Sequence, residues 1–201
     1  MTNDSCSPDD IQIIRQIVTG DVNAFEQLMK KYQNPVLRIV KKHIPNNHVE
    51  DATQDVFISM YQSLPTFRYE GGFDHWLSAI AVRTCYRFWR NHYKSREIPM
   101  SSLTEKQRVW LEDALSDPSS ESFGEKGLQE EASEILDWAL DRLSPEDRMV
   151  LELVHLEGYS VKEAARLLGW SAVNVKVRSF RSRNKLRKEL RKQYQDRRRG
   201  T

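Results

Sequence analysis

The most constraining feature of the sequence is the spacing of its apolar residues, which recur at intervals of three and four along most of the chain. One such stripe runs from Phe25 to Val40, and another runs from Ala132 to Leu143. This spacing places apolar side chains on one face of a helix, and the alternation typical of half-buried strands is absent. The pattern predicts an all-α fold. Pro35 lies inside the first stripe and is expected to kink or split that helix.

Helix punctuation divides the chain into two helical domains and a linker. Helices are predicted from about Val49 to Pro65 and from about Phe73 to Tyr93. Prolines, serine pairs, glycines and an excess of acidic residues then mark a linker over residues 94–128. We therefore expect a first domain over residues 9–93, an acidic linker over 94–128 and a second domain over 129–194.

Charge is distributed unevenly along the 201 residues. Between Lys176 and Arg199 lie 12 Lys and Arg residues and two acidic residues, whereas the whole chain carries a formal net charge of only +2. A strongly basic segment on an otherwise acidic chain indicates a polyanionic partner at that end. A solvated basic tail is the alternative.

Several classes of protein are excluded by what the sequence lacks. Its apolar runs are too short for a membrane-spanning helix, and its acidic N-terminus does not resemble a secretory signal. Its two cysteines form no C-x-x-C pair, its histidines show no ligand spacing, and no Gly-rich phosphate loop occurs. We therefore expect a cytoplasmic protein with no catalytic residues, no metal, no cofactor and no small-molecule substrate.

Residues 160–190 carry the pattern of a helix-turn-helix. Ser160 and Glu163 form a predicted capping box, Gly169 is a predicted helix stop, and Ser171 is a predicted cap of the following helix. On that second helix a narrow inner seam lies opposite a basic face. Such a helix enters the major groove, where its first turn meets base edges and later arginines meet phosphates. A helical hairpin with a merely solvated basic face is the alternative.

Two other helix faces have unusual chemistry. One face of the helix predicted from about Val49 carries three acidic residues and a glutamine: Glu50, Asp51, Asp55 and Gln54. That face is suited to docking a basic partner helix, although an ordinary solvated face has the same pattern. In the helix predicted from Phe73, arginines alternate with aromatic residues, a composition that suits unpaired nucleic acid because bases stack on aromatic rings. Some of these rings must belong to the core instead.

In their order along the chain, these motifs resemble those of bacterial sigma factors. Three segments resemble sigma region 2: Gly20-Asp21-x-x-Ala24-Phe25, Asp51-x-x-Gln54-Asp55-x-Phe57-Ile58 and Phe73-x-x-Trp76-Leu77-x-x-Ile80-Ala81. Three others resemble region 4: Leu143-Ser144-Pro145-Glu146-x-Arg148, Gly158-Tyr159-Ser160-x-x-Glu163-x-Ala165 and Val175-Lys176-x-Arg178-x-Phe180-Arg181-x-Arg183. Only a linker separates the two regions, and this arrangement resembles that of the extracytoplasmic-function (ECF) subfamily of sigma-70 type factors.

The resemblance implies a dissociable subunit that binds bacterial core RNA polymerase and directs promoter recognition and transcription initiation. It assigns binding of the β′ clamp helices to Asp51, Gln54, Asp55 and Phe57, with the β flap as a second contact on polymerase. It assigns binding of the melted −10 strand of promoter DNA to Trp76, Arg83, Tyr86, Arg87 and Arg90. It assigns binding of the −35 element to Ser171, Asn174, Lys176, Arg178, Phe180 and Arg181. The acidic linker would thread the polymerase channel, and an anti-sigma factor, often membrane-anchored, is a further expected partner.

Several residues depart from the pattern of that family. Arg83 and Arg87 stand where relatives commonly carry Asn and Asp, and arginine can only donate, stack or bind phosphate. Ser171 replaces a frequent proline, and Val177 replaces a small polar residue. We therefore expect base preferences particular to this chain. The competing hypothesis is an autonomous helix-turn-helix regulator with an N-terminal sensing or dimerisation domain, which would bind paired half-sites without polymerase.

Overall fold

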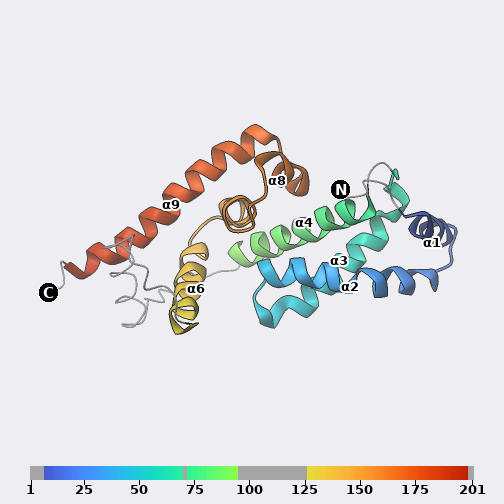
Figure 1. Ribbon diagram of the computed structural model, residues 1–201, viewed down its shortest axis with the longest axis horizontal. Coiled ribbons are helices and arrows are strands. Elements are labelled where there is room, and N and C mark those ends of the chain that lie inside the picture. The colour runs from blue at the N-terminus through green and yellow to red at the C-terminus, as the bar shows by residue number, and fades with distance from the viewer. Residues whose placement is uncertain (1–6, 70–71, 95–125, 199–201) are drawn as a thin grey trace. The chain divides into compact units, whose positions relative to one another are not determined.

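A computed structural model of the protein describes residues 7–69, 72–94 and 126–198. Over these residues every regular element is helical, which confirms the predicted all-α fold (Figure 1). Residues 95–125, which make up most of the predicted acidic linker, lie outside the described residues. The chain forms two compact units, one of residues 1–91 with 160–172 and the other of residues 92–159 with 173–201. None of the described helices is both long and apolar enough to cross a membrane.

The first unit is a helical bundle with an apolar core. Its longer helices are α1 (Pro8–Val18), α2 (Ala24–His43), α3 (Val49–Ser63) and α4 (Phe73–Lys94), and it includes the short α8 (Val161–Leu168). Two 3₁₀ turns, η1 (Asn46–His48) and η2 (Leu64–Thr66), flank α3, and η2 contains the predicted helix-ending proline. The largest fully buried side chains of this unit are Ile14, Leu28, Val36, Val40, Val56, Met60, Leu64 and Phe73.

Helix α2 is not split at Pro35, contrary to one of the two outcomes expected from the sequence. A proline inside a helix removes one backbone hydrogen bond and costs about 3 kcal/mol. Pro35 lies on the exposed side of α2. The opposite side buries Tyr32, Val36 and Val40 almost completely. Tertiary packing of this apolar face therefore outweighs the local penalty.

A buried carboxylate joins α1 to α2. Asp10, in the first turn of α1, is only 2% exposed and accepts hydrogen bonds from Lys31 Nζ at 2.6 Å and from Tyr32 Oη at 2.7 Å. Burial raises the pKa of Tyr32 well above its ordinary value, and its bond to the Asp10 carboxylate acts in the same direction. Tyr32 therefore remains a neutral hydrogen-bond donor inside the unit throughout the physiological pH range.

The second unit contains α6 (Lys126–Leu140), α7 (Pro145–Leu151), a π-helical turn η3 (Glu152–Leu156) and the long α9 (Ala172–Arg198). Leu140, Leu143 and Leu151 form one apolar cluster, against which Leu136 and Leu186 pack. Ile135 is buried against Trp138 and Leu190. The predicted seam on α9 is confirmed, since Val175, Ser179 and Ser182 are buried.

The helix ends carry the capping residues that the sequence predicts. Ser144 caps α7 by accepting a hydrogen bond from the Asp147 backbone N–H, with Pro145 at the first helical position. Ser160 and Glu163 form the capping box of α8. Gly169 ends α8 with φ of 72°, a left-handed conformation that side chains with a Cβ adopt only with strain.

Candidate nucleic-acid interface

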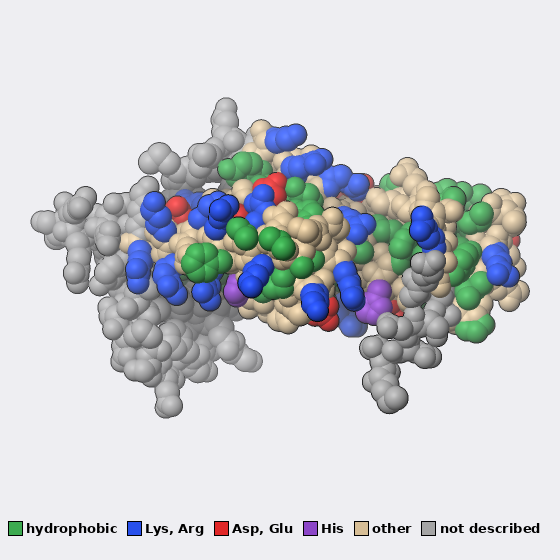
Figure 2. All heavy atoms as spheres, turned by 90° about the horizontal axis from the view of Figure 1, so that it is seen from above, with side chains coloured by type: hydrophobic (Ala, Val, Ile, Leu, Met, Phe, Trp, Pro, Cys, Tyr) green, Lys and Arg blue, Asp and Glu red, His purple; other side chains and the backbone are tan. Residues whose placement is uncertain are grey.

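The first half of α9 exposes a face that is basic and partly apolar. Asn174, Lys176 and Arg181 are exposed, and Phe180 is 61% exposed despite its large ring. Ser171, which immediately precedes α9, is also exposed. From Ser171 to Lys188 the sequence contains no acidic residue. Figure 2 shows Lys and Arg side chains bordering hydrophobic ones along this part of the surface. This face therefore combines positive charge with apolar surface.

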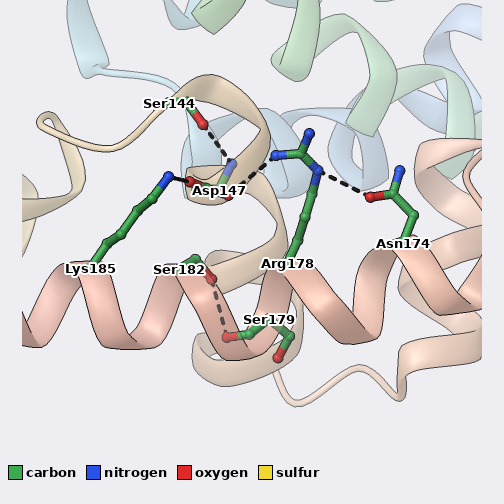
Figure 3. A network of polar contacts seen from close by, with 7 residues as sticks. All are labelled: Ser144, Asp147, Asn174, Arg178, Ser179, Ser182 and Lys185. Carbon is green, nitrogen blue, oxygen red and sulfur yellow. Dashed lines mark hydrogen bonds and ion pairs between the residues drawn. The ribbon is translucent and has the colours of Figure 1, made fainter.

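Arg178 is placed differently from its exposed neighbours. Its side chain is 35% exposed, and its guanidinium donates through Nη1 to Asp147 Oδ1 at 3.3 Å and through Nε to Asn174 Oδ1 at 3.1 Å. The other oxygen of Asp147 accepts a bond from Lys185 Nζ. Figure 3 shows Arg178 and Lys185 of α9 pointing toward the carboxylate of Asp147, which belongs to α7. Arg178 is therefore already part of the folded unit's own polar network.

Asp147 itself is a buried residue, with a side chain only 3% exposed. It lies at the third position of α7, where a negative charge is favoured by the helix dipole. Its two cationic partners balance its charge, and they lie 31 and 38 residues further along the chain. The carboxylate therefore fixes the rotation of α9 about its own axis, because it holds Arg178 and Lys185 on one side.

A second ionic network supports the same unit. Arg148, which is nearly buried, donates through Nε to Glu152 at 2.7 Å and through Nη1 to Asp141 at 2.8 Å. His155 Nε2 and Ser179 Oγ lie 2.9 Å apart and link η3 to α9. The ion pairs of Arg148 thus hold the segments around α7 together, and the His155 contact ties the inner face of α9 to η3, so the opposite face of α9 remains available to a partner.

The predicted −10 surface on α4 divides into core and exposed residues. Trp76 belongs to an aromatic cluster, with its ring centroid 5.0 Å from that of Phe67 and 5.3 Å from that of Phe73. Arg87 is exposed and donates to Ser59 Oγ at 3.2 Å, and Arg90 is exposed. Trp89, one of the rings that had to belong to the core, is 6% exposed and donates to the His43 carbonyl.

Two other predicted −10 residues contact α8 or the turn that follows it, within the first unit. Arg83 donates to the carbonyl oxygens of Arg166 at 3.2 Å and Leu167 at 3.0 Å, at the end of α8. Carbonyls at a helix C-terminus lack intrahelical partners and carry partial negative charge, so they suit a guanidinium. Tyr86 packs edge-on against Trp170, with ring centroids 5.5 Å apart.

The acidic face of α3 borders an apolar groove. Asp51, Gln54 and Asp55 are exposed, whereas Phe57 is only 6% exposed. Glu50 and Gln54 line a groove of about 1080 Å³ between α2 and α3, but Asp51 and Asp55 do not. The groove lining is largely apolar and includes Phe25, Met29, Leu37, Phe57, Ile58 and Tyr61.

Sequence reasoning missed two features of these surfaces. It did not identify the groove, although its exposed side chain Ile58 ends one of the motifs quoted above and its exposed Tyr61 follows three residues later. It also did not identify Asp147 as the partner of Arg178, because helical periodicity says nothing about contacts between distant helices. Among the described residues, no group of His, Cys, Asp or Glu is arranged to hold a metal ion.

Comparison with known proteins identifies the class to which this architecture belongs. Residues 28–95 match the family model for Sigma-70 region 2, and residues 133–186 match that for Sigma-70, region 4. The chain is 30% identical over 173 residues to the ECF RNA polymerase sigma-E factor of Escherichia coli K12, across 85% of this chain and 88% of that protein. It is 28% identical over 184 residues to the RNA polymerase sigma-H factor of Pseudomonas aeruginosa, across 90% and 93%.

The two matched regions define a sigma-70 type factor. At the level of the subfamily, the chain belongs to the ECF sigma factors of RNA polymerase. It binds core polymerase and directs promoter recognition and transcription initiation, so it is a sigma factor and not an autonomous regulator.

Similar solved structures include CnrH in complex with the cytosolic domain of CnrY, at 26% identity and a TM-score of 0.49, across 89% of this chain and 94% of that one. Another is RpoE in complex with the anti-sigma factor NepR from Bartonella quintana, at 22% identity and a TM-score of 0.46, across 85% and 98%.

Proposed function

We propose that the sigma function of this chain is divided among three surfaces: α3 with its groove for core polymerase, α4 for the −10 strand, and α9 for the −35 element. The observation that carries this division is the exposed face of α9, which is basic, contains no acidic residue before Glu189 and lies opposite a buried seam. A helix of this kind complements the phosphate backbone and the edges of the major groove.

On α3, the exposed acidic residues Asp51 and Asp55 attract a basic partner, while the adjacent groove offers apolar surface for the same partner to bury. Electrostatic complementarity sets orientation and association rate, and apolar burial supplies affinity. The β′ clamp helices of core polymerase are the partner that we assign to this surface, with the β flap as a second contact on polymerase. Phe57 contributes from the groove wall and not from the exposed acidic face.

On α4, we assign contacts with the melted −10 strand to the exposed Arg87 and Arg90 and to the partly exposed rings of Trp76 and Tyr86. Bases stack on aromatic rings, and cations beside those rings bind the phosphates. Arg83 can join them only when its bonds to the carbonyls of Arg166 and Leu167 open.

On α9, we assign the −35 element to Ser171, Asn174, Lys176, Phe180 and Arg181, which are exposed on or beside the first turns of the helix. Arg178 contributes mainly by positioning, because its guanidinium is bonded to Asp147 and Asn174.

In this account the chain has no active site and needs no metal or cofactor, because polymerase performs the chemistry. It acts in the cytoplasm, where polymerase and promoter DNA are found. We also propose that an anti-sigma factor restrains it by covering the groove between α2 and α3. The exposed apolar side chains Val22, Ile58 and Tyr61 would then be buried against that factor.

The experiment that tests the polymerase surface is a charge reversal, Asp55→Arg. Asp55 is exposed, so the variant should fold normally but lose capture by core polymerase, measured by co-purification and by sedimentation. Asp9→Arg reverses an exposed charge on α1 and serves as the matched control, with polymerase binding retained. An Asp55→Arg protein that binds polymerase as well as the control does would refute this assignment.

A further inference from the structure

The outermost face of α9 carries an apolar stripe that the assigned phosphate contacts do not explain. Val173, Val177 and Phe180 follow one another at intervals of four and three residues, and their side chains are 72%, 42% and 61% exposed. With 3.6 residues per turn, these three positions share one face of the helix. The buried residues Val175, Ser179 and Ser182 occupy the opposite face. The stripe therefore points directly away from the folded unit.

The surroundings of the stripe show what kind of partner covers it. Lys176 lies on one side and Arg181 on the other, both exposed, and no acidic residue occurs between Ser171 and Lys188. Figure 2 shows hydrophobic side chains interspersed with Lys and Arg side chains on this part of the surface. A partner that buries the stripe must therefore also accept positive charge on both flanks, as the two phosphate backbones of a DNA groove do.

The major groove offers only one apolar group to such a stripe. Guanine, cytosine and adenine present hydrogen-bond donors and acceptors there, whereas thymine also presents its C5-methyl group. Valine and phenylalanine side chains can neither donate nor accept, so they cannot read the polar groups of the other bases. From Val173 to Phe180 the helix rises about 10 Å, which corresponds to about three base steps.

We propose that Val177 and Phe180, extended by Val173, recognise thymine methyl groups in the −35 element of this protein's promoters. This inference rests on the proposed function, since it requires α9 to lie in the major groove at −35. It assigns a base preference to Val177, whose side chain is 42% exposed in the middle of the stripe. The −35 element then contains T·A pairs, with thymine on either strand, within the three base pairs that the stripe spans.

The experiment uses holoenzyme reconstituted from core polymerase and the full chain, bound to a promoter found by mapping its transcript starts. Each thymine of the −35 element is replaced in turn by deoxyuridine, which removes the methyl group and leaves every hydrogen-bonding group in place. Loss of one buried methyl should weaken promoter binding about fourfold at the contacted thymines. Deoxyuridine outside the element serves as the DNA control and should change nothing.

Val177→Ser completes the test as a double-mutant cycle. The variant should bind the thymine promoter about fourfold more weakly and should lose its sensitivity to deoxyuridine at one position. Val18→Ser is the matched control, because Val18 is 49% exposed on α1, and it should retain full sensitivity. Lys176→Ala should weaken binding to both DNAs equally and reduce the salt dependence instead.

The outcomes separate this inference from the function on which it rests. If no promoter is recognised with polymerase, the proposed function fails. If promoters are recognised but deoxyuridine has no effect at any −35 position, or the element consists only of G·C pairs, the methyl contact is refuted. If Val177→Ser impairs binding of core polymerase while DNA binding is unchanged, the stripe is a protein contact and the inference is wrong.

Discussion

Both units begin a helix with nearly the same four residues, but the last residue of the four has different partners in the two units. In the first unit this carboxylate contacts a helix that we do not assign to DNA, and in the second it contacts the helix that we assign to the −35 element. Ser7-Pro8-Asp9-Asp10 begins α1, and Ser144-Pro145-Glu146-Asp147 begins α7. The final aspartate is buried in both cases. Asp10 binds Lys31 and Tyr32 of α2, whereas Asp147 binds Arg178 and Lys185 of α9.

The comparison shows that one local motif can serve two purposes. Asp10 joins α1 to α2, neither of which we assign to DNA, so its contacts should affect stability and not DNA binding. Asp147 holds two cations of the helix that we assign to DNA, so its contacts set both the stability of the unit and the charge that α9 presents. Substitutions at the two aspartates should therefore differ in their effect on DNA binding and not only in their effect on stability.

The largest effect is expected from Asp147→Ala. Loss of the buried carboxylate leaves Arg178 and Lys185 without their shared anion, but both cations reach solvent, which reduces the cost. We expect the free energy of unfolding to fall by about 2–3 kcal/mol. Urea denaturation measures this change, and amide hydrogen exchange should place the lost protection in α7 and α9.

The same variant should make DNA binding by holoenzyme more dependent on salt, by up to about one or two charges, because an acidic neighbour of the basic face is removed. Wild-type stability together with an unchanged salt slope would show that Asp147 has neither role.

Asp10→Ala should have a smaller effect that is confined to stability. The buried Tyr32 hydroxyl loses its acceptor, and Lys31, which is 46% exposed, turns to water. We expect a loss of about 1–2 kcal/mol by urea denaturation, with promoter affinity and its salt dependence unchanged once the protein is folded. A steeper salt dependence in this variant would remove the distinction between the two aspartates.

Two arginine substitutions on α9 distinguish a residue bonded to Asp147 from one that is exposed. Arg178→Ala should lower both stability, by about 1 kcal/mol, and DNA affinity, because Arg178 is bonded to Asp147. Arg181→Ala should leave stability within about 0.5 kcal/mol and lower the salt slope of DNA binding by about one charge. Thermal unfolding and binding titrations at several salt concentrations measure both quantities. Equal stability losses in the two variants would contradict the positioning role of Arg178.

The smallest effects are expected at the two lysines. Lys31 and Lys185 are each about half exposed, so removal of either ion pair should cost no more than about 1 kcal/mol. Lys185→Ala should also reduce the salt slope of DNA binding, whereas Lys31→Ala should not. The same titrations test this, and identical salt slopes in the two variants would place Lys185 outside the DNA-binding face.

The parts of this fold that the sequence predicts are those determined locally. The caps at Ser144 and Ser160, the left-handed Gly169 and the limits of α3 and α4 each depend on residues within a few positions of one another. The course of α2 through Pro35 was not predictable in this way, because it depends on burial of Tyr32 and Val36 against other helices.

The candidate surfaces were predictable to a similar extent. Periodicity identified the basic face of α9 and the acidic face of α3, and the structure exposes most of those side chains. Periodicity did not show that Arg178 bonds to a carboxylate 31 residues away. It also did not show that Phe57 lies in a groove wall, because grooves and ion pairs arise from the packing of distant helices.

We propose that this chain gives core RNA polymerase its own promoter preference through surfaces on α3, α4 and α9. The most direct test mixes the purified protein with bacterial core polymerase and host genomic DNA, and maps the 5′ ends of the transcripts. We expect new start sites that share −35 and −10 elements, with thymines in the −35 element on one strand or the other. Absence of both polymerase binding and new starts, with sequence-specific DNA binding by the protein alone, would refute this role.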